Sequence, residues 1–107
     1  MKLIIAGSRD YILTTEDYAK LDAIPNVSEV VSGYAPGADT CGEKWASLNG
    51  FHIECFPVDW EMYGRAAAAF RDSQMAVYAD AVAIFPGGTE NMFQTAKTMK
   101  LKIYDFR

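Results

Sequence analysis

The feature that most constrains the fold of this chain is the alternation of short apolar runs with longer segments of helical pattern. Five runs are predicted to be β-strands: Leu3–Ala6, Glu29–Ser32, Ile53–Phe56, Ala81–Phe85 and Leu101–Tyr104. The first and fourth are nearly continuous in apolar residues, which is typical of strands buried on both faces. Strands separated by helical crossovers pair in parallel. The sequence therefore predicts an α/β fold, a three-layer sandwich around a five-stranded parallel sheet.

Four segments between and after these runs carry helix signals, with predicted extents from Thr14 to Pro25, Asp39 to Gly50, about Tyr63 to Tyr78, and about Thr89 onward. Thr14 is a capping residue, and Leu13 and Tyr18 stand at the two positions of a hydrophobic staple. Thr40 and Glu43 have the spacing of a capping box. The side chains expected to face the core are Cys41, Trp45 and Leu48 in the second helix, and Met92, Ala96 and Met99 in the fourth.

The charge balance argues against a protein that coats nucleic acid. Ten basic and fourteen acidic residues among 107 give a net charge of −4, whereas non-specific affinity for DNA or RNA comes from Lys and Arg. No apolar run approaches the length of a membrane helix, and the run at Leu3–Ala6 is too short for a signal peptide. We expect a single cytoplasmic domain over residues 1–107, with neither nucleic acid nor membrane as a partner.

The cysteines and the histidine offer little chemistry. Cys41 and Cys55 match no zinc motif and make no disulfide framework. His52 stands between two apolar residues of a predicted strand, so we interpret it as a half-exposed strand residue rather than a catalytic base. We expect no metal site and no cofactor.

Three glycine-containing loops follow predicted strands. They are Gly7-Ser8-Arg9-Asp10, the segment from Ser32 to Asp39, and Pro86-Gly87-Gly88-Thr89. In a parallel sheet these loops share the edge at the carboxyl ends of the strands, where ligands bind near the point at which strand order reverses. Glycines that only make tight turns are the alternative explanation. Three loops on one edge favour a ligand site instead.

The loop chemistry suggests a phosphate. Glycine lets a ligand approach the backbone closely, and a helix N-terminus offers N–H groups and partial positive charge. We therefore expect phosphate at the helix start formed by Gly87, Gly88 and Thr89. The other loop residues predicted to contact the ligand are Gly7, Ser8, Gly33, Ala35 and Gly37.

Two arginines and one aspartate are the charged residues that we predict to contact the ligand. Arg9 follows the first strand and could hold a phosphate, or could pair with Asp10 at the surface. Arg71 lies on a mostly apolar helix stripe and needs either a ligand anion or a carboxylate such as Asp39 or Glu43. Asp39 could cap the second helix, orient Arg71 or accept a ribose hydroxyl.

Two aromatic residues precede the third helix. Trp60 and Tyr63 could stack on a base, or could form a hydrophobic lid over the core.

Segments along nearly the whole chain resemble, in order, motifs of the YspA/cpYpsA-related branch of the SLOG superfamily. They are Gly7–Tyr11 ("GSRdy"), Val31–Asp39 with Gly42–Ala46 ("SGgApGAD…gekwA"), Trp60–Ala67 ("W…yGraAg"), Arg71–Ala81 ("RNxxMa…aDa") and Pro86–Thr89 ("PGGxGT"). The resemblance implies a Rossmann-like fold that binds nucleotides or nucleotide-derived ligands. The superfamily includes Lonely Guy phosphoribohydrolases, DNA-processing protein A and sensor domains of anti-phage systems, so a link to phage or anti-phage signalling is implied.

In the phosphoribohydrolases a "PGGxGTxxE" loop holds phosphate and supplies a carboxylate, and an arginine on the preceding helix completes the site. By this resemblance Arg71 matches that arginine, and Gly88 and Thr89 match the "GT". This chain departs from the motif, because its loop is shorter and Met92 stands where the motif has Glu. Methionine cannot stabilise an oxocarbenium-like state or activate water as a carboxylate does.

Two functions follow as hypotheses. The first is a binding module that senses, carries or sequesters a nucleotide or a nucleotide-derived small molecule. The second is an N-glycosidase or phosphoribohydrolase of nucleoside phosphates, with Arg71 and a carboxylate from Glu90, Glu43 or Asp39 as catalytic candidates. A scaffold with a vestigial pocket is a third reading. The absence of the motif's Glu favours binding, and a Met-rich or aromatic helix face would fit a homodimer.

Overall fold

A five-stranded parallel sheet forms the centre of the protein in a computed structural model, which describes residues 1–33, 37–87 and 89–107. The strands are β1 (Lys2–Ala6), β2 (Glu29–Ser32), β3 (His52–Cys55), β4 (Ala81–Ile84) and β5 (Lys102–Asp105). Their order across the sheet is β3-β2-β1-β4-β5, and every neighbouring pair is parallel. The predicted α/β fold with a five-stranded parallel sheet is confirmed, and each strand lies within two residues of its predicted run.

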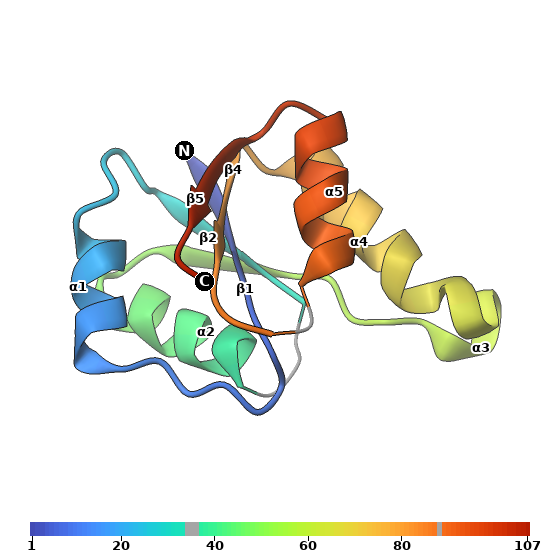
Figure 1. Ribbon diagram of the computed structural model, residues 1–107, viewed down its shortest axis with the longest axis horizontal. Helices are drawn as coiled ribbons and strands as arrows, with labels where there is room; N and C mark the ends of the chain where they lie inside the picture. Colours follow the sequence, from blue (N-terminus) through green and yellow to red (C-terminus); the bar gives the residue numbers. More distant parts are fainter. Residues whose placement is uncertain (34–36, 88) are drawn as a thin grey trace.

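Alternation along the strands divides the core into two halves, one on each face of the sheet. Figure 1 shows two pairs of helices on opposite sides of the sheet. Leu3 and Ile5 of β1 pack on the face covered by α1 (Thr15–Asp22) and α2 (Ala38–Leu48). Ile4 packs on the opposite face, against α4 (Ala67–Tyr78) and α5 (Glu90–Thr98). Successive strand residues point to opposite faces, so a strand buried on both sides must be apolar throughout. This is the three-layer sandwich that the sequence predicts.

Helix α1 begins as its sequence predicts. The Asp17 amide donates to the Thr14 hydroxyl at 3.2 Å, and the Thr14 amide donates to the Asp17 carboxylate at 3.0 Å. These two bonds form a capping box that satisfies backbone groups at the start of the helix. The helix ends at Asp22, before Pro25.

The start of α2 differs from its prediction. The helix begins at Ala38 with Gly37 as its N-cap, so Thr40 lies inside the first turn and the proposed capping box with Glu43 is wrong. Glu43 instead accepts a hydrogen bond of 2.6 Å from the Ser32 hydroxyl. Leu48 is predicted to face the core, but it is 77% exposed. It is the last residue of the helix and lies on the solvent side.

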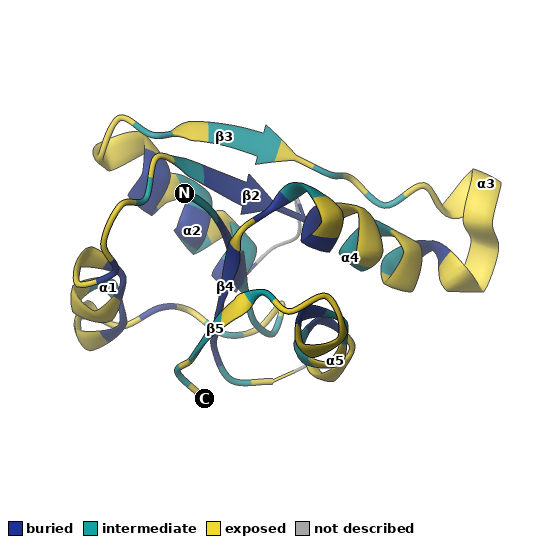
Figure 2. Cartoon of the chain, turned by 90° about the horizontal axis from the view of Figure 1, so that it is seen from above, coloured by how far each residue is buried: buried dark blue, intermediate teal, exposed yellow. Residues whose placement is uncertain are grey.

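The third predicted helix is broken. A short helix α3 (Trp60–Tyr63) and a 3₁₀ turn η1 (Gly64–Ala66) precede α4, and Gly64 has a φ of 55° that interrupts the helical path. Figure 2 shows α3 as an exposed segment beyond the end of α4, away from the sheet. The prediction for Met99 is also wrong, since this residue is the C-cap of α5 and is exposed.

The two outer strands are less buried than the central ones. His52 lies exposed on the edge strand β3, with its Nε2 3.0 Å from a Glu54 carboxylate oxygen. Both cysteines, Cys41 and Cys55, are free thiols. Across the described parts of the chain, no helix has the length and apolar character needed to cross a membrane.

Candidate ligand-binding site

The strand order reverses between β1 and β4. From β1 the chain proceeds outward to β2 and β3 on one side, whereas β4 and β5 extend the sheet on the other. The carboxyl ends of β1, β2 and β4 all meet at one edge because the strands are parallel. Open α/β sheets bind ligands at such a switch point, outside the strand ends.

Ser8 ties the loops of this edge together. Its amide donates to the Pro86 carbonyl at 3.1 Å, and its carbonyl accepts from the Ala38 amide at 3.4 Å. The loop after β1 is therefore bonded both to the loop after β4 and to the start of α2. A Cβ on Gly87 would lie 2.8 Å from the Ser8 Cβ, and a Cβ on Gly37 would lie 2.4 Å from the carbonyl oxygens of Ser8 and Arg9. Both positions need glycine for this close approach.

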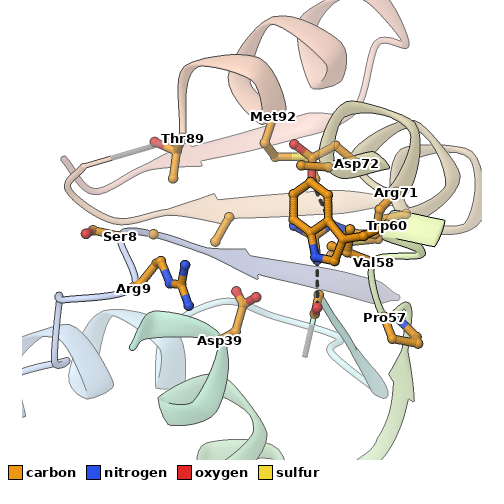
Figure 3. A pocket seen from close by; sticks show the side chains of 15 residues that line it. Ser8, Arg9, Asp39, Pro57, Val58, Trp60, Arg71, Asp72, Thr89 and Met92 are labelled. Carbon is orange, nitrogen blue, oxygen red and sulfur yellow. Dashed lines mark hydrogen bonds and ion pairs between the residues drawn. The ribbon is translucent and has the colours of Figure 1, made fainter. Parts of the chain in front are cut away.

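A pocket of about 600 Å³ opens at this edge (Figure 3). This volume is within the range of roughly 300–1,000 Å³ that is usual for small-molecule sites. Its walls come from the ends of β1 and β2, the segment after β3, and the helices α2, α3, α4 and α5. The lining residues are Ala6, Gly7, Ser8, Arg9, Gly33, Asp39, Pro57, Val58, Trp60, Ala68, Arg71, Asp72, Met75, Thr89 and Met92.

The structure brings together most of the residues that the sequence singled out for ligand contact. The predicted residues that line the pocket are Gly7, Ser8, Arg9, Gly33, Asp39, Arg71 and Thr89. Gly37 and Gly87 do not line it and pack behind Ser8. Ala35 and Gly88 lie outside the described residues. That these residues bind a ligand stays a prediction.

Arg71 is held in place from two sides. Its Nη1 donates to the Gly33 carbonyl at 2.6 Å, and its Nε lies 3.1 Å from the Asp72 carboxylate. Its side chain is only 14% exposed, yet it lines the pocket. A Cβ on Gly33 would lie 2.6 Å from Arg71 Nη1, so glycine is required for the guanidinium to come this close. Asp72, and not Glu43, is the carboxylate bonded to this arginine.

Arg9 occupies the opposite wall and is exposed. None of the ion pairs among the described residues includes it, so the predicted alternative of a salt bridge to Asp10 is wrong. In Figure 3 the side chains of Arg9 and Asp39 point toward one another. The pocket is thus lined by two guanidinium groups, one fixed and one at the surface.

The helices that start at the pocket have no side-chain caps of their own. Gly37 is the N-cap of α2 and has no side chain, and Thr89 is the N-cap of α5 and makes no side-chain capping hydrogen bond. Helix N-termini carry partial positive charge from their backbone N–H groups. Anions are favoured there, and phosphate is a common occupant of such sites.

A family model matches the part of the chain that builds most of this edge. The model is that of the YspA, cpYpsA-related SLOG family, and it matches residues 1–63. The chain belongs to this SLOG family. The match includes the loops at Gly7 and Gly33 and ends at Tyr63, the last residue of α3. No curated protein and no solved structure matches the chain.

Of the three carboxylates proposed as catalytic candidates, Asp39, Glu43 and Glu90, Asp39 alone is among the residues that line the pocket. Glu90 lines a separate hollow of about 350 Å³, where it lies 3.5 Å from Arg107 and accepts a hydrogen bond from Gln94. Glu43 does not line the pocket either, and Met92 does, as a buried side chain. Asp39 and Asp72 are the carboxylates of the pocket wall.

The segment after β3 adds residues that the sequence analysis missed. Pro57 and Val58 line the pocket, and they continue into an adjoining hollow of about 590 Å³ that also shares Trp60 and Arg71. Trp60 is 61% exposed, so it is not a lid over the core. Tyr63 does not line the main pocket and stacks on Phe70, with ring centroids 4.2 Å apart. The rule that strand ends share one edge, applied to β3, would have found Pro57 and Val58.

Proposed function

We propose that this SLOG-family chain binds a nucleotide or nucleotide-derived small molecule in the pocket at the switch point, and senses, carries or sequesters it. The observation that carries the proposal is Arg71. A guanidinium that is 14% exposed, fixed by Gly33 and Asp72, and present in the wall of an open pocket is suited to a phosphate. The N-termini of α2 and α5, whose N-cap residues make no side-chain capping hydrogen bond, add positive potential beside it.

Trp60 supports the nucleotide part of the proposal. Its indole lines the pocket and is mostly exposed, so stacking of a base does not require the core to open. Aromatic rings and nucleobases stack favourably whatever the base. Arg71 and Trp60 line the same pocket, so one nucleotide could place its phosphate near Arg71 and its base against Trp60.

The first experiment is native mass spectrometry of the protein as purified from cells, to look for a retained nucleotide. Calorimetry with a panel of ribonucleoside 5′-monophosphates then measures affinity. Arg71→Ala should weaken binding by about 1.5–3 kcal/mol, the usual contribution of a hydrogen bond to a charged group. It should lower the free energy of unfolding less.

Arg65→Ala is the matched control, because Arg65 is an exposed arginine of η1 that does not line the pocket. Equal losses of affinity in the two variants would reject a specific phosphate contact. An unfolded Arg71→Ala protein would favour a structural role for the guanidinium.

Hydrolysis is the second candidate function, favoured by the carboxylates Asp39 and Asp72 in the pocket wall. We expect release of base from nucleoside monophosphates to be slow or absent, because Met92 takes the motif position of the catalytic Glu and Glu90 lies outside the pocket. Incubation of purified protein with the same panel, followed by chromatography for free base, tests this. Robust release that Asp39→Asn abolishes and Glu90→Gln preserves would make the chain an enzyme.

A further inference from the structure

A row of three hydrogen bonds runs from α5 through α4 to the end of β2. Asn91 Nδ2 donates to Asp72 Oδ2 at 2.9 Å, and Arg71 Nε donates to Asp72 Oδ1 at 3.1 Å. Arg71 Nη1 then donates to the Gly33 carbonyl at 2.6 Å. Each oxygen of Asp72 therefore has a different partner, one on its own helix and one on the next.

The row leaves part of the guanidinium available. Arginine has five N–H donors in a rigid plane. Two of the three nitrogens of Arg71 are committed to Asp72 and Gly33, and these bonds fix the plane of the group. Since the side chain also lines the pocket, the donors outside the row remain for an anion there.

We propose that Asp72 and Asn91 are positioning residues, which hold the Arg71 guanidinium in the orientation that binds the phosphate of the ligand. This inference rests on the proposed function. Asp72 holds the arginine, and Asn91 holds Asp72. A long side chain that is already oriented loses less conformational freedom on binding, so the bound state is favoured.

Asn91 connects the start of α5 to the arginine on α4 through Asp72. Asn91 is the second residue of α5, two positions after Thr89, which itself lines the pocket. The helix start that we expect to face a phosphate is thereby joined to the arginine on α4. The two groups approach the same anion as one connected unit.

Two substitutions test the row, each with a control on the same helix. Asp72→Asn keeps the shape of the side chain and removes its charge, and Asn91→Ala removes the outer bond. Ser73→Ala is the control on α4, because Ser73 is exposed and its hydroxyl donates to the Ala69 carbonyl of its own helix. Gln94→Ala is the control on α5, because Gln94 is exposed and does not line the pocket.

The first readout is affinity for the ribonucleoside 5′-monophosphates and for inorganic phosphate. Loss of one charge-assisted bond predicts about tenfold weaker binding for Asp72→Asn, and about threefold for Asn91→Ala. The controls should bind as the wild type does. In an Arg71→Lys background neither substitution should weaken binding further, because the group they position is gone.

The sign of the Asp72→Asn effect is decisive. If the carboxylate only repelled the ligand, its removal would strengthen binding. Affinity equal to or above that of the wild type in Asp72→Asn overturns the proposal.

The second readout needs no ligand. The ¹⁵N–¹H signal of Arg71 Nε, identified by its loss in Arg71→Lys, should shift or broaden in Asp72→Asn and in Asn91→Ala and stay fixed in both controls. A signal that is unchanged in both test variants overturns the positioning role. If the wild type binds none of the probes, the proposed function fails, and this signal still decides whether Asp72 and Asn91 orient the arginine.

Discussion

The N-terminus of α1 is closed by the protein's own side chains, whereas α2 and α5 begin without such caps at the pocket. In α1, Thr14 and Asp17 bond reciprocally to each other's backbone amides. At α2 and α5 the N-caps are Gly37 and Thr89, and neither of these two residues makes a side-chain capping hydrogen bond. Helices of one small fold thus begin in two ways.

The contrast shows how the same physical requirement can serve structure or function. Every helix start favours a negative charge or an acceptor near its free amides. Asp17 supplies it at α1: burial alone would raise the pKa of this carboxyl, but hydrogen bonds from Thr14 and Tyr11 overcome burial and lower the pKa. At the pocket, an external anion could take the same role.

Gly37→Ala, at the N-cap of α2, should have the largest effect on stability. Gly37 has φ 78° and ψ −128°, a backbone conformation that residues other than glycine rarely adopt. A Cβ there would lie 2.4 Å from the Ser8 and Arg9 carbonyl oxygens. Backbone strain and the clash together should lower the free energy of unfolding by about 3 kcal/mol. Urea denaturation at pH 7 measures it.

Gly64→Ala is the control for that effect. Gly64 has nearly the same backbone conformation, φ 55° and ψ −130°, but no atom lies within 4 Å of its added Cβ. Strain alone should cost about 1 kcal/mol there. Equal losses in the two variants would mean that the contact with the loop after β1 contributes nothing.

Asp17→Asn, which changes the capping box of α1, should have an intermediate effect on stability. The variant loses a charged acceptor for the Thr14 amide and the Tyr11 hydroxyl, and its free energy of unfolding should fall by about 2 kcal/mol at pH 7. Nucleotide affinity should not change, because Asp17 does not line the pocket. A large loss of affinity would mean that the two kinds of helix start are not separable.

The pH dependence of this variant has a definite sign. The folded state lowers the pKa of Asp17 below its ordinary value of 3.8. Its contribution is therefore fully present well above this ordinary value and is lost as the pH falls through the lower, folded pKa. The free energies of unfolding of the wild type and Asp17→Asn should differ most at pH 7, and the difference should shrink as the pH falls below 3.8, as measured by urea denaturation at each pH.

The fold was predictable where the sequence pattern is local. Apolar runs identify the five strands because strands of a parallel sheet are buried on both faces. The start of α1 follows from Thr14. The break before α4 was missed because a run of alanines favours helix, while Gly64 acts through a single φ value that composition does not encode.

The site was predictable where the topology alone places residues. Gly7, Gly33 and Thr89 follow strands that end at one edge, so parallel pairing brings them together. Asp72 was missed because adjacent helix residues do not normally face each other, so no spacing rule links it to Arg71. Its bond to Asn91 depends on the packing of α4 against α5, which no local pattern records.

Thr89→Asp should have the smallest effect on stability, and it gives α5 a capping side chain of the kind that α1 has. A carboxylate at the N-cap interacts favourably with the first amides, but Thr89 is only 6% exposed and desolvation of the charge opposes this gain, so the free energy of unfolding should change by only about 0.5 kcal/mol. The same charge occupies the place that we assign to phosphate, so affinity for nucleoside monophosphates should fall about tenfold, or about 1.4 kcal/mol.

Thr89→Asn is the control, since it can cap without charge and should retain more of the affinity. Calorimetry gives the affinities and urea denaturation the stabilities. If Thr89→Asp binds nucleotide as tightly as the wild type, the start of α5 contacts no phosphate, and the missing cap there is a feature of the fold alone.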